Sequence, residues 1–216
     1  MTEYQTKAEI VYTKILDKIL KGEYKPGEKL VIRQISAELG VSDTPIREVF
    51  KRLESEHYVE YSANRSVTVR KMESSEIEEF FCIKGVLEGY ATRISIDSLT
   101  SHDIEEIKAI NEEMKEAIKN GSLSSISSLN KKFHMRIYAN MHNRQLLEMI
   151  EDIWNKWSVT KRVFSTSPER ALHSTEEHDE IIRLIEDKEY DKVELFVREH
   201  KIRAGREMVG SIMRNN

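Results

Sequence analysis

The chain of 216 residues has few of the residues that mark secreted, fibrous or membrane-spanning proteins: one cysteine, three prolines and eight glycines. The single cysteine, Cys82, excludes an intramolecular disulfide framework and suits a reducing compartment. No uninterrupted apolar stretch approaches the length needed to cross a bilayer, and the first residues lack a hydrophobic signal core. We therefore expect a cytoplasmic protein with no membrane partner. Cys82 lies in the apolar run 80–83, where we expect a buried packing thiol.

Charge is divided unevenly along the chain, and the length suffices for one large or two modest cores. Residues 1–72 carry 13 Lys and Arg against 11 Asp and Glu, an excess of +2. Residues 73–216 carry 21 against 27, an excess of −6, and the two together give the net charge of −4. Because the positive excess of the N-terminal part is small, net charge alone says little about nucleic-acid binding. Evidence for DNA binding must therefore come from a sequence motif.

Residues 30–53 have the pattern of two short helices joined by a tight turn. The second helix has an apolar stripe at positions i, i+3, i+4 and i+7, which are Ile46, Val49, Phe50 and Leu53. Ser42 or Thr44 can cap its start, and Pro45 is tolerated only in a first turn. The first helix directs Ile35 and Leu39 inward and stops at Gly40. Thr44, Arg47 and Lys51 remain off the stripe, as in a helix-turn-helix that reads bases.

The flanking segments extend this hairpin into a larger motif. An upstream helical face at Ile15 and Ile19 precedes a Pro26–Gly27 turn. Downstream, residues 58–61 and 67–69 read as two short strands, with Arg65 between them. Three helices followed by a two-stranded wing predict a winged helix, although a helical hairpin without DNA-binding function remains the alternative.

Residues 12–69 resemble the winged-helix domain of the GntR transcription factors. The matching residues are Tyr12, Ile15, Ile19, Gly22, Pro26, Gly27, Leu30, Leu39, Gly40, Val41, Ser42, Thr44, Pro45, Arg47, Glu48, Leu53, Val59, Asn64 and Arg65. The resemblance implies that six residues face DNA, namely Arg33, Ser42, Thr44, Arg47, Asn64 and Arg65. Two positions depart from the family: Asp43 replaces a usual Arg or Lys, and Ser66 replaces the usual wing glycine.

From Glu73 onward glycine and proline become rare and helical periodicity dominates. Helices are predicted over about 74–96, 101–120, 124–141, 143–163, 168–187 and 190–213. The predicted fold is therefore mainly α: a winged helix-turn-helix in residues 1–72, then an antiparallel six-helix bundle in residues 73–216. We expect Trp154 and Trp157 to pack in the core or an interface, and the acidic run 176–180 to be solvated apart from His178.

Three of the seven histidines lie on apolar faces of three different helices. His134 shares a helix face with Asn130, four residues earlier, while His178 and His200 occur among apolar residues of the last two helices. Three inward imidazoles suit zinc or another divalent transition metal. The alternative from the residues alone is three separate core histidines, each with its own hydrogen-bonded partner.

The second half resembles the all-helical FCD effector domain of the FadR-like GntR branch. The residues that carry this likeness are Leu87, Glu88, Asn130 to His134, Asn143 to Leu147, Glu177, His178, Glu199 and His200. The resemblance implies a metal held by Asn130, His134, His178 and His200, with zinc or nickel favoured and manganese also suited. Asn130 replaces the usual Asp, which should weaken the site. Lys84 replaces an Arg that commonly binds an effector carboxylate, so we expect Lys84 to contact the effector unless it is a surface lysine.

These features favour a homodimeric, sequence-specific regulator whose affinity for a double-stranded operator responds to a small-molecule effector. A metal-dependent hydrolase using the three histidines is the alternative, but the chain lacks a His-Glu-x-x-His motif and a nucleophile elbow. A structural adaptor whose winged helix binds protein is a third hypothesis, which Arg47 and Arg65 argue against.

Overall fold

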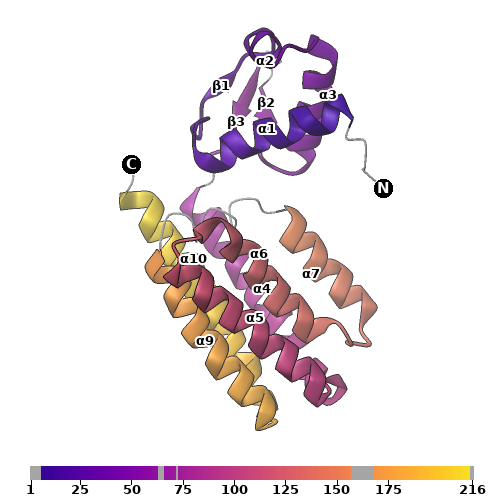
Figure 1. The fold of residues 1–216 in the computed structure, drawn as a ribbon, viewed down its shortest axis with the longest axis vertical. Helices are drawn as coiled ribbons and strands as arrows, with labels where there is room; N and C mark the ends of the chain where they lie inside the picture. The colour runs from indigo at the N-terminus through magenta and orange to yellow at the C-terminus, as the bar shows by residue number, and fades with distance from the viewer. Residues whose placement is uncertain (1–5, 63–65, 72, 157–167, 215–216) are drawn as a thin grey trace. The chain divides into compact units, whose positions relative to one another are not determined.

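The computed structural model describes residues 6–62, 66–71, 73–156 and 168–214. The chain folds as two compact units, and the first changes to the second between residues 71 and 73. Each unit is described by itself, and Figure 1 shows their elements.

The first unit is a three-helix fold with a small antiparallel sheet. Its helices are α1 (Lys7–Lys21), α2 (Ile32–Leu39) and α3 (Asp43–Ser55), and its strands are β1 (Lys29–Leu30), β2 (Val59–Tyr61) and β3 (Val67–Val69). The strands are ordered β1-β3-β2, with Glu60 opposite Thr68 in the β2–β3 pair. The hairpin of β2 and β3 is the predicted wing, while β1 was not predicted.

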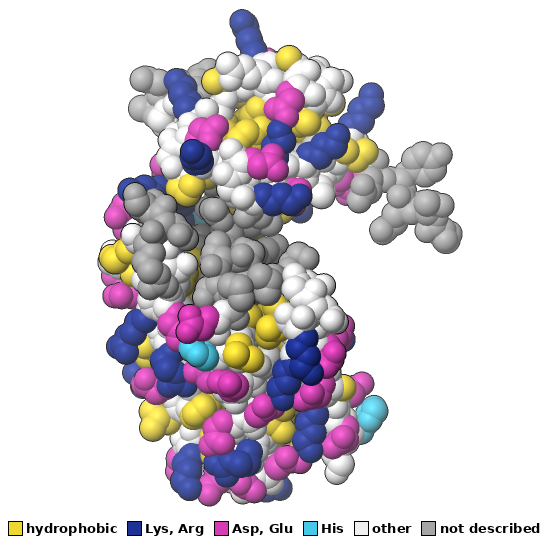
Figure 2. All heavy atoms as spheres, turned by 60° about the vertical axis from the view of Figure 1, so that its left-hand side comes forward, with side chains coloured by type: hydrophobic (Ala, Val, Ile, Leu, Met, Phe, Trp, Pro, Cys, Tyr) yellow, Lys and Arg dark blue, Asp and Glu magenta, His cyan; other side chains and the backbone are white. Residues whose placement is uncertain are grey.

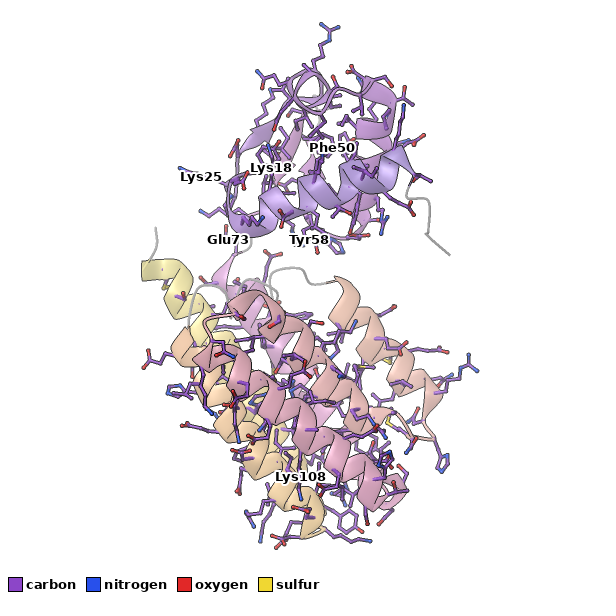
Figure 3. All side chains as sticks on the ribbon, in the orientation of Figure 1. Lys18, Lys25, Phe50, Tyr58, Glu73 and Lys108 are labelled. Atoms are coloured by element: carbon purple, nitrogen blue, oxygen red, sulfur yellow. The ribbon has the colours of Figure 1, made fainter. Side chains whose placement is uncertain are left out.

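The predicted apolar stripe of α3 forms the centre of this unit. Ile46, Val49, Phe50 and Leu53 are all buried, together with Ile15 and Ile19 of α1 and Ile35 of α2. Figure 3 shows Phe50 inside the unit, whereas Lys25 points outward. Gly40 ends α2 in the left-handed conformation, with a φ of 65°, which glycine adopts without steric cost.

The second unit is a helical bundle. Its elements are α4 (Ser74–Ser95), the 3-10 turn η1 (Ile96–Ser98), α5 (Ser101–Lys119), α6 (Leu123–Tyr138), α7 (Arg144–Lys156), α9 (Pro168–Glu186) and α10 (Tyr190–Arg214). Six α-helices in the described part of this unit match the predicted fold class. The predicted end of the fourth helix, near Val163, falls outside the described residues, as does Trp157.

Helices α4 and α10 pack most extensively, and α5 packs against both α6 and α9 (Figure 1). Two glycines of α4 allow the close approach of α10. A Cβ built on Gly85 would lie 2.8 Å from the backbone oxygen of Arg198, and one on Gly89 would lie 2.6 Å from that of Glu194. Any larger side chain at either position would therefore force the two helices apart.

The prediction that Cys82 is buried is wrong, because its side chain is exposed. The buried face of α4 includes Phe80, Phe81, Lys84 and Glu88, whereas Cys82 lies on the exposed side of the helix. The apolar run around it therefore spans both faces. Figure 2 shows that Lys and Arg are interspersed with Asp and Glu over the displayed face of the bundle. No helix among the described residues is long and apolar enough to cross a membrane.

Candidate metal centre and nucleic-acid interface

The three predicted histidines meet inside the bundle. His134 comes from α6, His178 from α9 and His200 from α10, and all three side chains are buried. One ring nitrogen of each lies within 4.8 Å of the others. We call this group the three-histidine cluster. Three imidazole nitrogens grouped in this way could hold one metal ion, and imidazole is a common ligand of zinc.

The ring of His178 is oriented by a buried asparagine. Nδ1 of His178 lies 3.0 Å from the side-chain oxygen of Asn111. The Asn111 amide nitrogen donates to the carbonyl of Thr175 at 3.1 Å and to the Asp179 carboxylate at 2.8 Å, so the amide oxygen must face His178. His178 therefore carries its proton on Nδ1 and keeps a lone pair on Nε2, which is buried without a hydrogen-bond partner.

The ring of His200 is oriented by a carboxylate. Nδ1 of His200 donates to Glu177 at 2.6 Å, and Glu177 also accepts hydrogen bonds from Arg170 and Arg203, each at 2.6 Å. Partial burial raises the pKa of Glu177, but the bond from His200 and the charge of Arg170 outweigh this and hold the pKa well below its usual range. Nε2 of His200 is thereby left as the lone-pair nitrogen. Such carboxylate–histidine pairs commonly support metal ligands.

The ring of His134 has no hydrogen-bond partner on either buried nitrogen. This observation disfavours the alternative of separately satisfied core histidines. Burial lowers the pKa of His134 and of His178 well below 6.5, and it lowers the pKa of His200 to about 4. All three rings are therefore neutral near pH 7, the form that coordinates a metal. Partnerless buried nitrogens on neutral rings fit a divalent ion.

Asn130 lies on α6 one turn before His134 and is buried. Its side-chain oxygen is 3.5 Å from the hydroxyl of Ser174. It lines a cavity of about 30 Å³, room for roughly two water molecules. The other lining residues are Phe81, Lys84, Ser127, Trp154, Arg170, Ser174, His200, Lys201 and Ala204. Asn130 and His200 thus border the same space.

Lys84 is 2% exposed, which excludes a surface lysine. Its ammonium lies 3.0 Å from the centroid of the Trp154 ring and 3.3 Å from the carboxylate of Glu88. Burial lowers the pKa of Lys84 to about 7. Trp154 is buried in the core as predicted, and its indole nitrogen has no hydrogen-bond partner.

Lys201 is a second buried cation beside the cavity, and sequence reasoning missed it. Its ammonium lies 3.1 Å from Glu88, which also accepts a hydrogen bond from the Tyr138 hydroxyl at 3.0 Å. Burial lowers the pKa of Lys201 to about 8. Burial also raises the pKa of Glu88, but the charges of Lys201 and Lys84 prevail and lower it. In the sequence, only its position directly after His200 indicated that Lys201 lies near the cluster.

The acidic run 176–180 is not uniformly solvated, contrary to expectation. The side chain of Glu177 is only 15% exposed and holds His200. Asn111 and Arg170 were also not predicted, and Asn111 contacts the cluster across two helices, through packing that no local pattern reveals. Arg170 is fully buried and reaches Glu177 on the same helix α9.

On the first unit, four of the predicted DNA-facing residues are exposed: Arg33, Ser42, Thr44 and Arg47. Asn64 and Arg65 lie outside the described residues. Asp43, which departs from the family pattern, accepts a hydrogen bond at 2.8 Å from the Ser36 hydroxyl. It therefore links α2 to the first turn of α3. Ser42 precedes α3 as its N-cap residue, without a side-chain capping bond.

Comparisons with known proteins agree with these two units. Residues 7–69 match the bacterial regulatory proteins of the gntR family, and residues 79–203 match the FCD domain. The HTH-type transcriptional regulator McbR of Escherichia coli (strain K12) is 30% identical over 133 residues, which are 62% of this chain and 60% of that protein. The uncharacterized HTH-type transcriptional regulator YdhC of Bacillus subtilis (strain 168) is 26% identical over 190 residues, 88% of this chain and 85% of that protein.

A solved structure of E. coli McbR/YncC superposes with a TM-score of 0.71 at 21% identity, covering 99% of this chain and 100% of that one. This likeness shows the fold. The FCD match covers more than half of the chain, and the gntR match describes regulatory proteins, so the hydrolase alternative is set aside. The chain belongs to the GntR family of bacterial transcriptional regulators and carries a gntR-type DNA-binding domain followed by an FCD domain.

Proposed function

We propose that this regulator binds its operator under the control of a divalent metal and a small anionic effector, both held inside the FCD domain. The observation that carries the proposal is the three-histidine cluster: buried ring nitrogens of His134 and His178 have no hydrogen-bond partner. His200, the third member, lines a cavity together with the buried Lys84 and Lys201. Neutral imidazoles favour zinc or nickel, and manganese is a third candidate.

His134, His178 and His200 would hold the metal, with the neutral oxygen of Asn130 as a weak or water-bridged fourth ligand. When bound, a divalent ion supplies positive charge and an open coordination position for an effector oxygen. Asn111 and Glu177 fix the ring orientations of His178 and His200 in advance. Loss of such supporting residues typically lowers metal affinity by about 10–100-fold.

The effector class follows from two buried donors that line the cavity. The ammonium of Lys84 and the indole nitrogen of Trp154 are buried donors without hydrogen-bond partners. A ligand rich in acceptor oxygens, such as a small carboxylate, would satisfy both donors. Lys84 is compact and flexible, so it binds as a point charge and without the two-pronged geometry of an arginine.

The exposed residues at the start of α3 would read the operator. Arg47 lies one turn into this helix, off the buried stripe, where helix-turn-helix proteins place base-reading side chains. Arg33 and Thr44 would join it, and Ser42 would contact the phosphate backbone. Asn64 and Arg65 keep their predicted role at the wing.

We further propose that the bundle forms a homodimer, because a single winged helix buries little surface on DNA. Ile83, Val86 and Tyr90 form an exposed apolar stripe on α4, each 46–56% exposed, which suits a second copy of the chain. Light scattering at micromolar concentration should give about twice the 25.3 kDa chain mass. Val86→Glu should shift the protein to monomer, and a wild-type monomer both free and on DNA would contradict the proposal.

Two measurements test the proposed function together. A gel shift with genomic fragments should select an operator, and titration of that operator with and without zinc plus succinate should show a change in DNA affinity. Calorimetric titration of zinc in succinate buffer should give one ion per chain for wild type. His178→Ala should weaken zinc binding by more than the 10–100-fold expected for losing a supporting residue. Equal zinc binding by both proteins would refute the shared site.

A further inference from the structure

Asp43 brings a negative charge to the start of α3, the helix that we expect to read the operator. Its side chain is partly exposed, and its neighbours Ser42 and Thr44 are exposed. Arg47 lies on the same side of the helix, because residues four apart in a helix lie one above the other. Asp43 therefore lies among the proposed base-reading residues, although the phosphates of DNA repel a carboxylate.

The carboxylate of Asp43 is oriented by a residue of α2. Its Oδ1 accepts a hydrogen bond at 2.8 Å from the hydroxyl of Ser36, a residue that is only 8% exposed. The carbonyl oxygen of Arg33 lies 3.1 Å from the same hydroxyl, so Asp43 is the nearer of two acceptors for its single proton. Within the described part of the chain, no hydrogen bond or ion pair involves the second oxygen, Oδ2.

A purely structural role accounts for only part of this arrangement. A negative charge in the first turn of a helix stabilises it by about 0.3–1 kcal/mol, and the bond from Ser36 joins α2 to α3. Neither effect uses Oδ2 of Asp43. That oxygen is an oriented acceptor available to a donor from outside the chain.

The chemistry of a carboxylate favours one of the four bases. An ionised carboxylate can only accept hydrogen bonds. In the major groove guanine presents two acceptors, thymine presents an acceptor and a methyl group, and adenine presents an acceptor beside its amino group. Cytosine alone presents an amino donor without an acceptor next to it. The charge that accepts from cytosine also repels the acceptors of the other bases, and such repulsion is a source of specificity.

We propose that Asp43 is a specificity-determining residue that accepts a hydrogen bond from the N4 amino group of a cytosine in the operator, with Ser36 fixing the orientation of the carboxylate. The inference rests on the proposed operator-reading role of α3 and adds a base that this helix selects. Arginine suits guanine, so the operator should hold this cytosine within a few base pairs of the guanine that Arg47 contacts.

The test selects operators from a random duplex library with the full chain. Asp43→Asn keeps the shape and can still accept from Ser36, but its amide suits adenine, so the selected base should change from cytosine to adenine. Asp43→Ala should select no base at this position and should bind random-sequence DNA more tightly, because the repulsion of phosphates is lost. The matched control is Asp17→Asn on α1, which removes the same charge from an exposed pair with Lys21. It should select the wild-type operator.

A modified base tests the predicted atom. For wild type, exchange of the selected cytosine for another base should weaken binding about tenfold, equivalent to about 1.4 kcal/mol at 25 °C. N4-methylcytosine still pairs with guanine but blocks the amino hydrogen that faces the groove, so it should weaken wild-type binding by a similar factor. Asp43→Ala should bind both duplexes equally. Ser36→Ala keeps the charge but frees the carboxylate, so it should reduce the preference for cytosine.

Two results would overturn the inference. One is the same preference for cytosine in wild type and Asp43→Ala. The other is an equal loss of affinity for every sequence in Asp43→Ala together with a lower melting temperature, which would assign Asp43 a structural role alone. An unchanged preference for cytosine in Ser36→Ala would overturn the orienting role of Ser36.

Failure of the proposed operator-reading role has a different signature. In that case wild type enriches no sequence from the library, or Arg47→Ala enriches the same sequence as wild type. If Arg47→Ala alters the enriched sequence and the Asp43 variants do not, the reading role of α3 stands and the inference about Asp43 fails. Thermal unfolding of each variant would verify that its fold is retained.

Discussion

Glu88 is the buried carboxylate on which the charge balance of the FCD core depends. It lies 3.3 Å from the ammonium of Lys84, 3.1 Å from that of Lys201 and 3.0 Å from the Tyr138 hydroxyl. Glu88→Gln keeps the size of the side chain and removes its charge, so two buried ammonium groups lose their partner. Removing one partner of a buried ion pair typically costs about 3–5 kcal/mol. At about 2–4 °C per kcal/mol for a domain of this size, the melting temperature should fall by roughly 6–20 °C.

The matched control is Lys84→Met, which replaces a buried cation by an apolar side chain of similar length. It leaves Glu88 paired with Lys201 and should be neutral or stabilising at pH 7, since burial already disfavours the charged form of Lys84. In the double variant, Glu88→Gln should cost less than in wild type, by a coupling energy of about 0.5–3 kcal/mol. Thermal unfolding of the metal-free proteins would measure the stability of Glu88→Gln, Lys84→Met and the double variant relative to wild type. A loss below about 0.5 kcal/mol for Glu88→Gln would refute this reasoning, because that is the range of ordinary surface substitutions.

Three further predictions address other parts of the molecule. Arg47→Ala should weaken binding to a selected operator by about 1–3 kcal/mol at fixed salt. The control, Lys108→Ala on α5 (Figure 3), should leave operator affinity unchanged. Equal operator affinities of wild type and Arg47→Ala would show that Arg47 does not contact the bases. Gly89→Ala should lower the melting temperature, although alanine favours helices over glycine by about 1 kcal/mol. The reason is that the new Cβ would lie 2.6 Å from the backbone oxygen of Glu194 on α10. An unchanged or higher melting temperature would show that α10 can shift. The folded-state pKa values of the three histidines lie below the unfolded value of about 6.5, and the pKa of His200 is about 4. Between pH 6.5 and 4 the unfolded chain therefore binds more protons than the folded chain. The free energy of unfolding of the metal-free protein should consequently fall on acidification from pH 6.5 to 4. Denaturant titrations at several pH values would measure that fall, and a flat profile would contradict the neutral buried state.

The local elements could be predicted because their signals are local. The apolar spacing of α3 and the stop at Gly40 are each contained within a few residues, and the structure has both as predicted. Strand β1 was missed because two residues are too short to show an alternating pattern. Cys82 was misassigned because its apolar neighbours were read as one run, whereas helical periodicity separates them into two faces.

The inner partners of the cluster could not be predicted in the same way. Lysine and glutamate are rarely buried, so composition argues against placing Lys201 and Glu177 near a core. Their roles arise from helix packing, which brings Lys201 to Glu88 of α4 and Glu177 to His200 of α10. Asn111 reaches His178 across 67 residues of sequence. Such long-range pairs leave no trace in a single sequence, whereas the histidines themselves could be found because each lies on an apolar helix face.

Native mass spectrometry most directly tests whether the three-histidine cluster holds a divalent metal together with an anion. The protein would be purified without chelator, equilibrated with zinc and succinate, and compared with His178→Ala treated in the same way. We expect wild-type chains to carry the added mass of one metal ion and one anion together, and His178→Ala to carry neither. Wild-type chains without added mass, or variant chains that retain as much metal as wild type, would contradict the account.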